Sequence, residues 1–471
     1  MSTKTPIQTA HEAPTTPPNH NTRLSVARAL TQVIKHRRTI EWVRVQRPQW
    51  LESPVHRELL YGTLRHYLSL NQTIDQLLKK PLKTKDIDLQ HVMLVGAYQL
   101  IYTAMADYAA INECVSACKA LGKPWAKGLV NGVLRTLQRQ HQERPLNTSG
   151  DDLALADHPT WMANKLSEQY GSTGPQLLLA NNQRGPMTLR INTSAIDVST
   201  YKYRLTEAGI GFDQGPWPET IVLHTPQAAA ELPGWQHGHC AVQDMAAQYA
   251  AHLVVDNLPT SHDPTVPIRI LDACAAPGGK LFHLHETLGE LGISCEIHAL
   301  DSSKRRLADL ANIAQRLGHA TRTPSQPEDT KAIVLHWGDG AALDLAFNRP
   351  FDVILIDAPC SGSGTIRRNP DIRLLLEETA LLEQQDLQLR LLQNLWQHTK
   401  PGGSLLYSTC SVFAEENDQV ISHWLEQTAD ASVQPLNIAH GQQTDFGWQL
   451  LPTESWTDGF YYCALNKAST K

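Results

Sequence analysis

Two cysteines stand in short strings whose residue types could carry out covalent chemistry. Cys360 follows Asp-Ala-Pro and precedes Ser-Gly, and Cys410 follows Tyr-Ser-Thr and precedes Ser. Each string comes after an apolar run typical of a buried strand, at residues 351–356 and 404–407. Parallel α/β sheets bind ligands beyond the carboxyl ends of their strands, so we expect both thiols at one crevice. Flanking Ser, Pro and Gly favour nucleophilic thiols over inert core cysteines.

A glycine-rich loop and two acids mark the ends of three other expected strands. The loop at 271–280 reads Leu-Asp-Ala-Cys-Ala-Ala-Pro-Gly-Gly-Lys, and its spacing matches neither a dinucleotide fingerprint nor a phosphate loop. It could also be an ordinary Pro-Gly turn. Asp301 could accept hydrogen bonds from ribose hydroxyls or act as a helix N-cap. Asp339 could bind an adenine amine or be only a turn aspartate. Taken together, the three positions favour a nucleoside pocket.

Strands and helices alternate in the last part of the chain. The expected strands cover 268–272, 295–301, 333–337, 351–356 and 404–407, with helices at 304–317 and 377–398. This alternation predicts a parallel, doubly wound sheet. A β-rich run at 459–465 is expected to add a late edge strand.

The part before residue 241 has two other patterns. Apolar residues at helical spacing predict an all-helical region, and a polar linker follows it. A helix from 158 toward 179 then precedes short strands at 188–192, 221–223 and 240–244, and a helix at 245–255 leads into the last domain. The expected domains are a disordered tail at 1–22, a helical domain at 23–143, a small α+β domain at 150–240 and an α/β domain at 241–471.

Composition limits the classes of function. The chain has 471 residues and a net charge of −6, which argues against a uniformly basic nucleic-acid coat. Basic residues nevertheless cluster at 35–38, 119–144 and 367–373. Eight cysteines without a Cys-x-x-Cys pair do not suggest a disulfide framework, and no apolar run could span a bilayer. We expect a cytoplasmic monomer with no metal and no membrane contact.

The motifs resemble those of a known family. The strings at 272–280, 357–361 and 408–411 are similar to those of RNA cytosine-5 methyltransferases that use S-adenosylmethionine. The stretch at 367–373 resembles the one that follows the Pro-Cys motif there, and the helical N-terminal third resembles a NusB-type RNA-binding domain. Such a fusion is similar to bacterial 16S rRNA enzymes. It implies a NusB-like all-α domain, an α+β RNA-binding or linker domain and a Rossmann-like class I methyltransferase domain.

The resemblance also implies roles for residues. Cys410 would add to carbon 6 of the cytosine, and Cys360 would assist product release. Asp357 would contact the base edge or the cofactor, and Lys280 would position the base or Cys410. S-adenosylmethionine would be the cofactor and 16S rRNA the partner, with cytosine 967 as the implied target. Arg367, Arg368 and Arg373 would hold phosphates. The expected cofactor-binding residues are Cys274, Ala275, Ala276, Pro277, Gly278, Gly279, Lys280, Asp301, Asp339 and Asp357.

Other functions stay open on the sequence. A DNA cytosine-5 methyltransferase takes its nucleophile from a Pro-Cys motif, so Cys360 would attack and Cys410 would be idle. The Thr-Cys string and the NusB-like region argue against that alternative. A non-catalytic RNA-binding ribosome-assembly factor would not need intact motifs, and a methyltransferase acting on another RNA would share all of them.

Overall fold

The chain forms two compact units, at residues 1–148 and 149–471. The computed structural model describes residues 21–146, 150–259, 265–327, 329, 331–342, 345, 347–453 and 456–469. The tail expected at 1–22 lies outside these ranges except for its last two residues, and Thr22 already begins the first helix.

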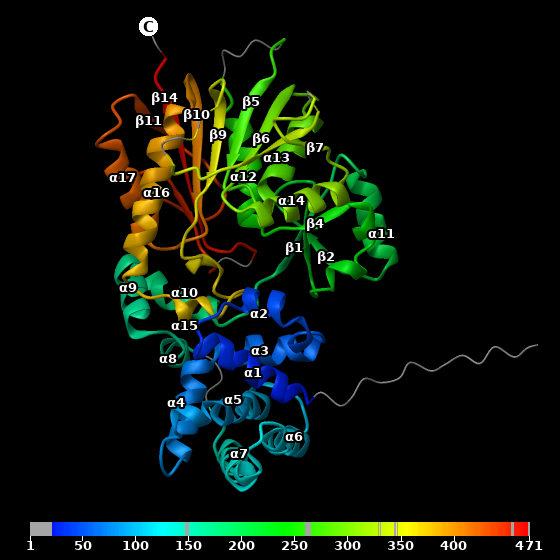
Figure 1. Cartoon of the computed structure of the whole chain (residues 1–471), viewed down its shortest axis with the longest axis vertical. Coiled ribbons are helices and arrows are strands. Elements are labelled where there is room, and N and C mark those ends of the chain that lie inside the picture. The colour runs from blue at the N-terminus through cyan, green and yellow to red at the C-terminus, as the bar shows by residue number, and fades with distance from the viewer. Residues whose placement is uncertain are drawn as a thin grey trace, which may run out of the picture. The chain divides into compact units, whose positions relative to one another are not determined.

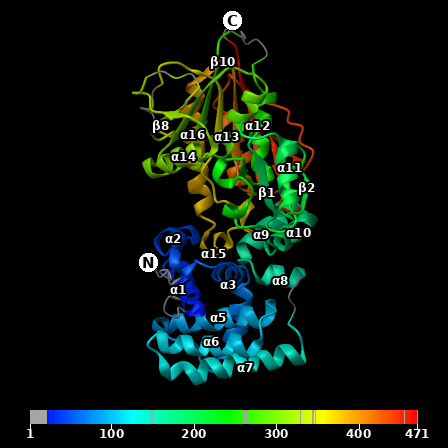
Figure 2. The same cartoon turned by 90° about the vertical axis from the view of Figure 1, so that its right-hand side faces the viewer.

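The first unit is helical, with one buried helix at its centre. Helix α5 is buried from Leu89 to Leu100, and it contacts five other helices of the unit, α1, α3, α4, α6 and α7 (Figure 1 and Figure 2). An apolar helix of this kind belongs inside a bundle. The long helices are α1 (Thr22–Ile34), α2 (Ile40–Gln46), α3 (Pro54–Arg65), α4 (Tyr67–Leu77), α5 (Ile87–Tyr102), α6 (Asp107–Ala120) and α7 (Lys127–Glu143).

The second unit begins with short helices and a small antiparallel sheet. Helices α8 (Asp151–Ala156), α9 (Thr160–Tyr170) and α10 (Gly174–Asn181) precede a sheet of order β2-β3-β1-β4. The single helix expected from 158 toward 179 is interrupted at Gly171, whose φ of +53° favours glycine. The sheet comprises β1 (Met187–Ile191), β2 (Phe212–Gln214), β3 (Thr220–Leu223) and β4 (Cys240–Val242), with α11 (Val198–Glu207) between β1 and β2.

A second, larger sheet follows, and Figure 1 shows helices beside it. Its order is β12-β13-β14-β10-β9-β5-β6-β8-β7, and β11 pairs with β14. The strands from β10 to β7 are parallel. They are β5 (Ile268–Ala273), β6 (Cys295–Asp301), β7 (Thr321–Arg322), β8 (Ile333–Trp337), β9 (Phe351–Asp357) and β10 (Thr399–Thr409).

Helices cover both faces of this sheet, as expected for a doubly wound domain. Alternate residues of β5 face opposite cores: Ile270 packs with α12, α13 and α14, whereas Leu271 packs with α16 and α17. The helices are α12 (Met245–Asp256), α13 (Gly279–Glu290), α14 (Lys304–Leu317), α15 (Ile372–Leu375), α16 (Ala380–Gln397) and α17 (Asp418–Leu425). The five expected parallel strands and the helix at 304–317 are all present.

The last strand is not an edge strand, so that expectation is wrong. Strand β14 (Phe460–Lys467) runs antiparallel to β10, and β11 (Ala431–Gln434) and β13 (Trp448–Leu450) pair with it as well. The two-residue β12 (Gln442–Gln443) extends the sheet beyond β13. Strands β11 and β13, which pair with β14, are short and half-polar, so the sequence pattern does not predict them.

A buried ion pair joins the small sheet to the large domain. Arg190 of β1 is fully buried, and its Nε and Nη2 lie 3.0 and 2.9 Å from the two carboxylate oxygens of Glu286 on α13. Two parallel bonds of this kind fix orientation as well as distance. The ion pair therefore fixes the position of the small sheet relative to α13, the helix that follows the glycine-rich loop.

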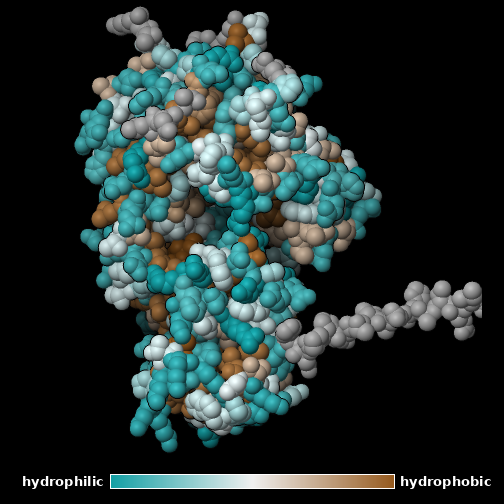
Figure 3. All heavy atoms as spheres, viewed as in Figure 1, coloured by the Kyte–Doolittle hydropathy of each residue, from teal (hydrophilic) through white to brown (hydrophobic). Residues whose placement is uncertain are grey.

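The outer surface is mixed in character. On the face drawn in Figure 3, hydrophilic side chains predominate and hydrophobic ones are scattered among them. Within the described ranges, no helix has both the length and the apolarity needed to cross a bilayer.

Candidate active site

The two cysteines of the Pro-Cys and Thr-Cys strings lie side by side. Cys360 comes three residues after β9, and Cys410 directly follows β10, which pairs with β9 in parallel. Their Sγ atoms are 3.4 Å apart. The hydrogen bond with Cys410, together with burial, raises the pKa of Cys360 well above that of an ordinary thiol. Cys360 is therefore protonated at neutral pH and can donate a hydrogen bond or a proton to its neighbour.

A buried glutamate that the sequence analysis missed braces both cysteine loops. Glu416 is fully buried, and its carboxylate accepts hydrogen bonds from the Ser361 backbone N and Oγ, both at 2.6 Å. It also accepts one from the Ser411 hydroxyl. Each serine directly follows one of the cysteines. The sequence shows only a pair of acids after Phe413, which gives no sign that one of them is buried.

Two glycines bring a third segment against the Cys410 loop. Gly364 donates its backbone N–H to the carbonyl of Cys410 at 2.9 Å, and its carbonyl accepts from Gly459 N at 2.9 Å. A Cβ atom at Gly364 would lie 2.1 Å from the Gly459 carbonyl oxygen, so only glycine fits there.

An ion pair lies at the same end of the sheet. The Lys280 Nζ is 2.7 Å from Asp357 Oδ2 and 4.6 Å from the centre of the Phe460 ring. Lys280 is in the first turn of α13, and Asp357 ends β9. The structure thus brings together the loop lysine and the acid three residues before Cys360, a pairing that the sequence analysis did not predict.

The glycine-rich loop is held against the end of β6. Ala275 N donates to the carbonyl of Leu300 at 3.0 Å, and Ala276 N donates to Asp301 Oδ2 at 3.3 Å. The other oxygen of Asp301 accepts from Ser303 N at 2.8 Å. Ser303, not Asp301, is the N-cap of α14, so the N-cap alternative for Asp301 is wrong.

The loop contains two residues with positive φ. Cys274 has φ +64° and Gly278 has φ +104°, and α13 begins at Gly279. The backbone N–H groups of a helix start favour polar or anionic ligand groups. Between Cys274 and Gly278, the side chain of Pro277 is exposed. Burial raises the pKa of Cys274, so this thiol is not suited to act as a nucleophile.

A second residue missed as a site candidate is Asp272, at the end of β5. It is 1% exposed, and neither carboxylate oxygen has a hydrogen-bond partner in the described part of the chain. Burial and the nearby charge of Asp357 raise its pKa well above the usual range. A buried acceptor of this kind is costly unless a ligand supplies donors. The amino and hydroxyl groups of S-adenosylmethionine are such donors, so the residues fit this cofactor.

The structure places Asp339 at the rim of this region. Asp339 is exposed, and its Oδ1 accepts from Ala341 N at 3.0 Å, as a turn aspartate does. The preceding residue, Gly338, donates its N–H to the carbonyl of Asp301 at 3.2 Å. The turn is therefore attached to the end of β6, and one oxygen of Asp339 accepts no hydrogen bond within the described residues.

The arginines after the Pro-Cys motif are paired inside the unit, and only Arg368 is partly exposed, so their expected role in phosphate binding is wrong. Arg367 is 3% exposed and binds Asp458 Oδ1 at 2.6 Å. Arg368 pairs with Asp458 and with Asp244, at 2.6 Å from the latter. Arg373 is fully buried and donates to the Asn181 carbonyl at 2.6 Å. These side chains join elements within the unit, because burying a guanidinium requires internal partners.

The fold and this set of strand ends define a class of protein. A glycine-rich loop after the central β5, an acid at the end of β6 and a buried carboxyl group without a hydrogen-bond partner among the described residues, near the end of β5, lie at one edge of a Rossmann-like sheet, the edge at which such sheets bind nucleosides. This is a methyltransferase that uses S-adenosylmethionine.

Comparison with known proteins narrows the class to a family. The chain is 36% identical over 452 residues to the ribosomal RNA small subunit methyltransferase B of Klebsiella pneumoniae, covering 95% of this chain and 98% of that protein. It is 35% identical to the protein of the same name from Escherichia coli, covering 95% and 99%. The chain belongs to the ribosomal RNA small subunit methyltransferase B family.

Family matches and solved structures agree with the domain types. Residues 20–139 match the NusB family, 158–230 a ferredoxin-like domain of RsmF/B-like methyltransferases, and 260–466 the family described as 16S rRNA methyltransferase RsmB/F. The crystal structure of PH0851 superposes with a TM-score of 0.75 at 22% identity, covering 95% of this chain and 98% of that one. A methyltransferase homologue from Pyrococcus horikoshii gives 0.55 at 27% identity, covering 68% and 100%.

Proposed function

We propose that this enzyme methylates carbon 5 of a cytosine in 16S rRNA through a covalent adduct with Cys410. The observation that carries the proposal is the pair of thiols 3.4 Å apart beyond two adjacent parallel strands. A single buried cysteine could be explained by packing alone. Two thiols beyond the ends of adjacent strands are better explained as a nucleophile and a second thiol that assists it. The relatives named above support ribosomal RNA of the small subunit as the substrate.

Cys410 is the proposed nucleophile. Carbon 5 of cytosine is a poor nucleophile until a thiolate adds to carbon 6, which places electron density on carbon 5. Asp357 and Lys280, paired at 2.7 Å, would contact the base edge and balance the charge of the adduct. The Glu416 brace holds both thiols in place while the ring is bound. Splitting one difficult step into an addition and an elimination is nucleophilic catalysis.

Cys360 is the proposed partner in release. After methylation, a base removes the proton from carbon 5, the carbon–sulfur bond breaks, and the Cys410 thiolate leaves. Cys360, whose high pKa keeps it protonated, lies within hydrogen-bond distance of that sulfur. A thiol donor there stabilises the departing thiolate.

The cofactor would occupy the edge formed by β5, β6 and β8. Cys274 to Lys280, Asp301, Asp339 and Asp357 would line it, with Asp272 as an additional acceptor. S-adenosylmethionine supplies the methyl group as an electrophile when it is bound. The target base must leave its stack to reach this edge, which costs a few kcal/mol and is least costly in a loop. Cytosine 967 is the target that the resemblance implies.

Cysteine variants test the assignment. We expect Cys410→Ala to abolish methyl transfer to undermodified 16S rRNA while S-adenosylmethionine binding stays near normal, because the cofactor edge lacks that thiol. We expect Cys360→Ala to accumulate a protein–RNA adduct that survives a denaturing gel. Cys295→Ala, at the start of β6, is the control and should behave like the unmodified enzyme.

The opposite pattern would contradict the proposal. Methyl transfer by Cys410→Ala would exclude Cys410 as the nucleophile, and an adduct that forms only through Cys360 would favour the Pro-Cys alternative. Mapping 5-methylcytosine in rRNA from a deletion strain tests the target. If the deletion strain lacks 5-methylcytosine at another position, cytosine 967 is not the target.

A further inference from the structure

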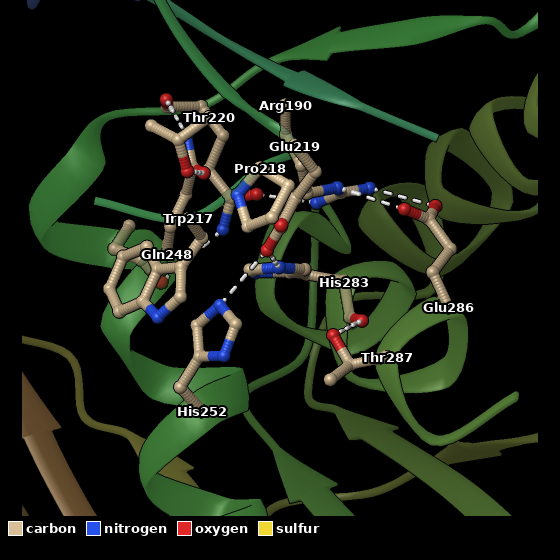
Figure 4. Close-up of polar contacts among 12 residues, drawn as sticks. Arg190, Trp217, Pro218, Glu219, Thr220, Gln248, His252, His283, Glu286 and Thr287 are labelled. Carbon is tan, nitrogen blue, oxygen red and sulfur yellow. Dashed lines mark hydrogen bonds and ion pairs between the residues drawn. The ribbon is translucent and has the colours of Figure 1, made fainter. Parts of the chain in front are cut away.

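Three side chains that could bind a metal converge away from the two thiols. Glu219 directly precedes β3 of the small sheet, His252 is on α12, and His283 is on α13. Figure 4 shows the three side chains pointing toward one another. We call this set the His2Glu cluster. One donor atom from each residue lies within 4.8 Å of the other two.

Two of the donor–donor distances are close to those of a metal site. Glu219 Oε1 lies 3.0 Å from His252 Nε2 and 3.4 Å from His283 Nε2. Tetrahedral coordination with bonds of about 2.0–2.1 Å places its ligand atoms about 3.4 Å apart. The two imidazole rings are nearly perpendicular, at 79°. A single carboxylate oxygen lies within hydrogen-bond distance of both Nε2 atoms. A cation bound by the two Nε2 atoms would take the place of their protons, and each neutral ring would then carry its proton on Nδ1.

The surroundings hold the ligands in place. The side chain of His283 is 2% exposed, that of Glu219 is 11% and that of His252 is 20%. Trp217 stacks on the His252 ring with centroids 3.9 Å apart and planes 8° apart. The neighbouring Arg190 and Glu286 neutralise each other through their ion pair, as Figure 4 also shows. The net charge of this region comes from Glu219 and is negative.

We propose that Glu219, His252 and His283 bind a divalent transition-metal ion of the zinc class, which ties the small sheet to α12 and α13. The three donors come from two domains and are separated by up to 64 residues in the chain. Three protein ligands leave one tetrahedral position for water. The ion would add a second link to the one that Arg190 and Glu286 make. The proposal departs from the sequence-based expectation of no metal, because the donors form no local spacing motif.

Cobalt titration of the full-length protein tests this proposal. Protein freed of metal with a chelator is titrated with Co²⁺ and followed by visible absorption, and Zn²⁺ is then added as competitor. We expect one equivalent to bind, with no thiolate-to-metal charge-transfer band, and Zn²⁺ to displace it. Glu219→Gln and His252→Gln should each weaken binding about 100-fold or more, since losing a ligand costs at least as much as losing an outer-shell contact.

A matched control separates the cluster from ordinary histidine–carboxylate pairs. His224 Nε2 also lies 3.0 Å from a carboxylate, that of Asp213, but both side chains are 55% exposed, and no third donor joins them among the residues that the structure describes. His224→Gln should bind cobalt as the parent protein does. Circular dichroism checks that each variant is folded, and the partly exposed His252 makes His252→Gln the milder change.

Two outcomes would overturn the proposal. If the parent protein binds no cobalt, or binds it no better than both variants, the His2Glu cluster is a hydrogen-bonded triad. A charge-transfer band that persists in Glu219→Gln would place the metal on cysteines instead.

Discussion

At the scale of single residues, the proposed chemistry depends on a carboxylate that touches neither cysteine side chain. Glu416 receives hydrogen bonds from the serine after Cys360 and the serine after Cys410. Burial raises the pKa of Glu416, whereas the hydrogen bonds from Ser361 and Ser411 work to lower it. Glu416 is thus a positioning residue for both thiols.

We predict that Glu416→Gln lowers the methylation rate about 100-fold, because a displacement near 1 Å has that effect on a reacting group. The amide has one acceptor oxygen in place of two, so it cannot accept all three hydrogen bonds from Ser361 and Ser411 in the same geometry. Affinity for S-adenosylmethionine should stay unchanged. Steady-state methylation and calorimetric cofactor binding measure the two quantities.

The neighbouring Glu415→Gln is the control for this prediction. Glu415 pairs with Lys165 on α9 at 2.5 Å and makes no described contact with the cysteine loops. The methylation activity of the Glu415→Gln variant should stay near that of the parent enzyme. Equal losses in the two variants would mean that Glu416 acts only through general stability.

At the scale of elements, the turn from β5 into α13 connects the cofactor edge to the rest of the site. Gly278 has φ +104°, and a Cβ atom there would lie 2.3 Å from the Phe282 ring. Phe282 is 1% exposed in the core between α13 and the sheet and cannot move freely. The turn therefore requires glycine for its backbone conformation and for space.

We predict that Gly278→Ala destabilises the protein by about 1–3 kcal/mol, the usual cost of an L residue in such a backbone conformation. Affinity for S-adenosylmethionine should fall as well, because the loop backbone must shift. Thermal unfolding and cofactor titration measure these effects. Gly289→Ala, at an exposed site on the same helix with no atom within 4 Å of the new Cβ, should have little effect or stabilise slightly. A variant of Gly278 as stable as the parent would contradict the argument.

At the scale of the whole molecule, the chain combines a helical unit with a catalytic unit. The net charge of −6 gives no overall attraction to RNA. Because the arginines at 367–373 are internally paired, positive charge available for phosphates must come from elsewhere. The turn between α1 and α2 is exposed from Lys35 to Arg38.

We predict that the double variant Lys35→Gln/Arg38→Gln raises the KM for rRNA with little change in kcat. Each lost phosphate contact should lower the slope of log affinity against log salt by about 0.7 on single-stranded RNA. Filter binding over a series of salt concentrations measures this slope. Arg44→Gln is the control, because Arg44 is already paired with Glu41 at 2.7 Å. An unchanged slope in the double variant would exclude this turn from RNA binding.

The sequence by itself determined the features that depend on local order. The strands at 295–301 and 333–337 and the helix at 304–317 have the predicted bounds. The spacing of their apolar residues is enough to predict these bounds, because the period of a helix or strand is a local property of the chain. The adjacency of the two thiols also followed from sequence, since the carboxyl ends of parallel strands meet at one edge.

Only the tertiary structure decided which polar residues are buried and with what partners. Arg367 pairs with Asp458, which is 91 residues further along the chain. Glu219 pairs with His283, which is 64 residues further along. Strand β14 lies inside the sheet because short strands from elsewhere in the chain pair with it. Such pairings depend on how distant segments pack, and a buried charge and a solvated one have the same letter in the sequence. The residue types set the possible chemistry of this protein, and packing decided which of them are placed to perform it.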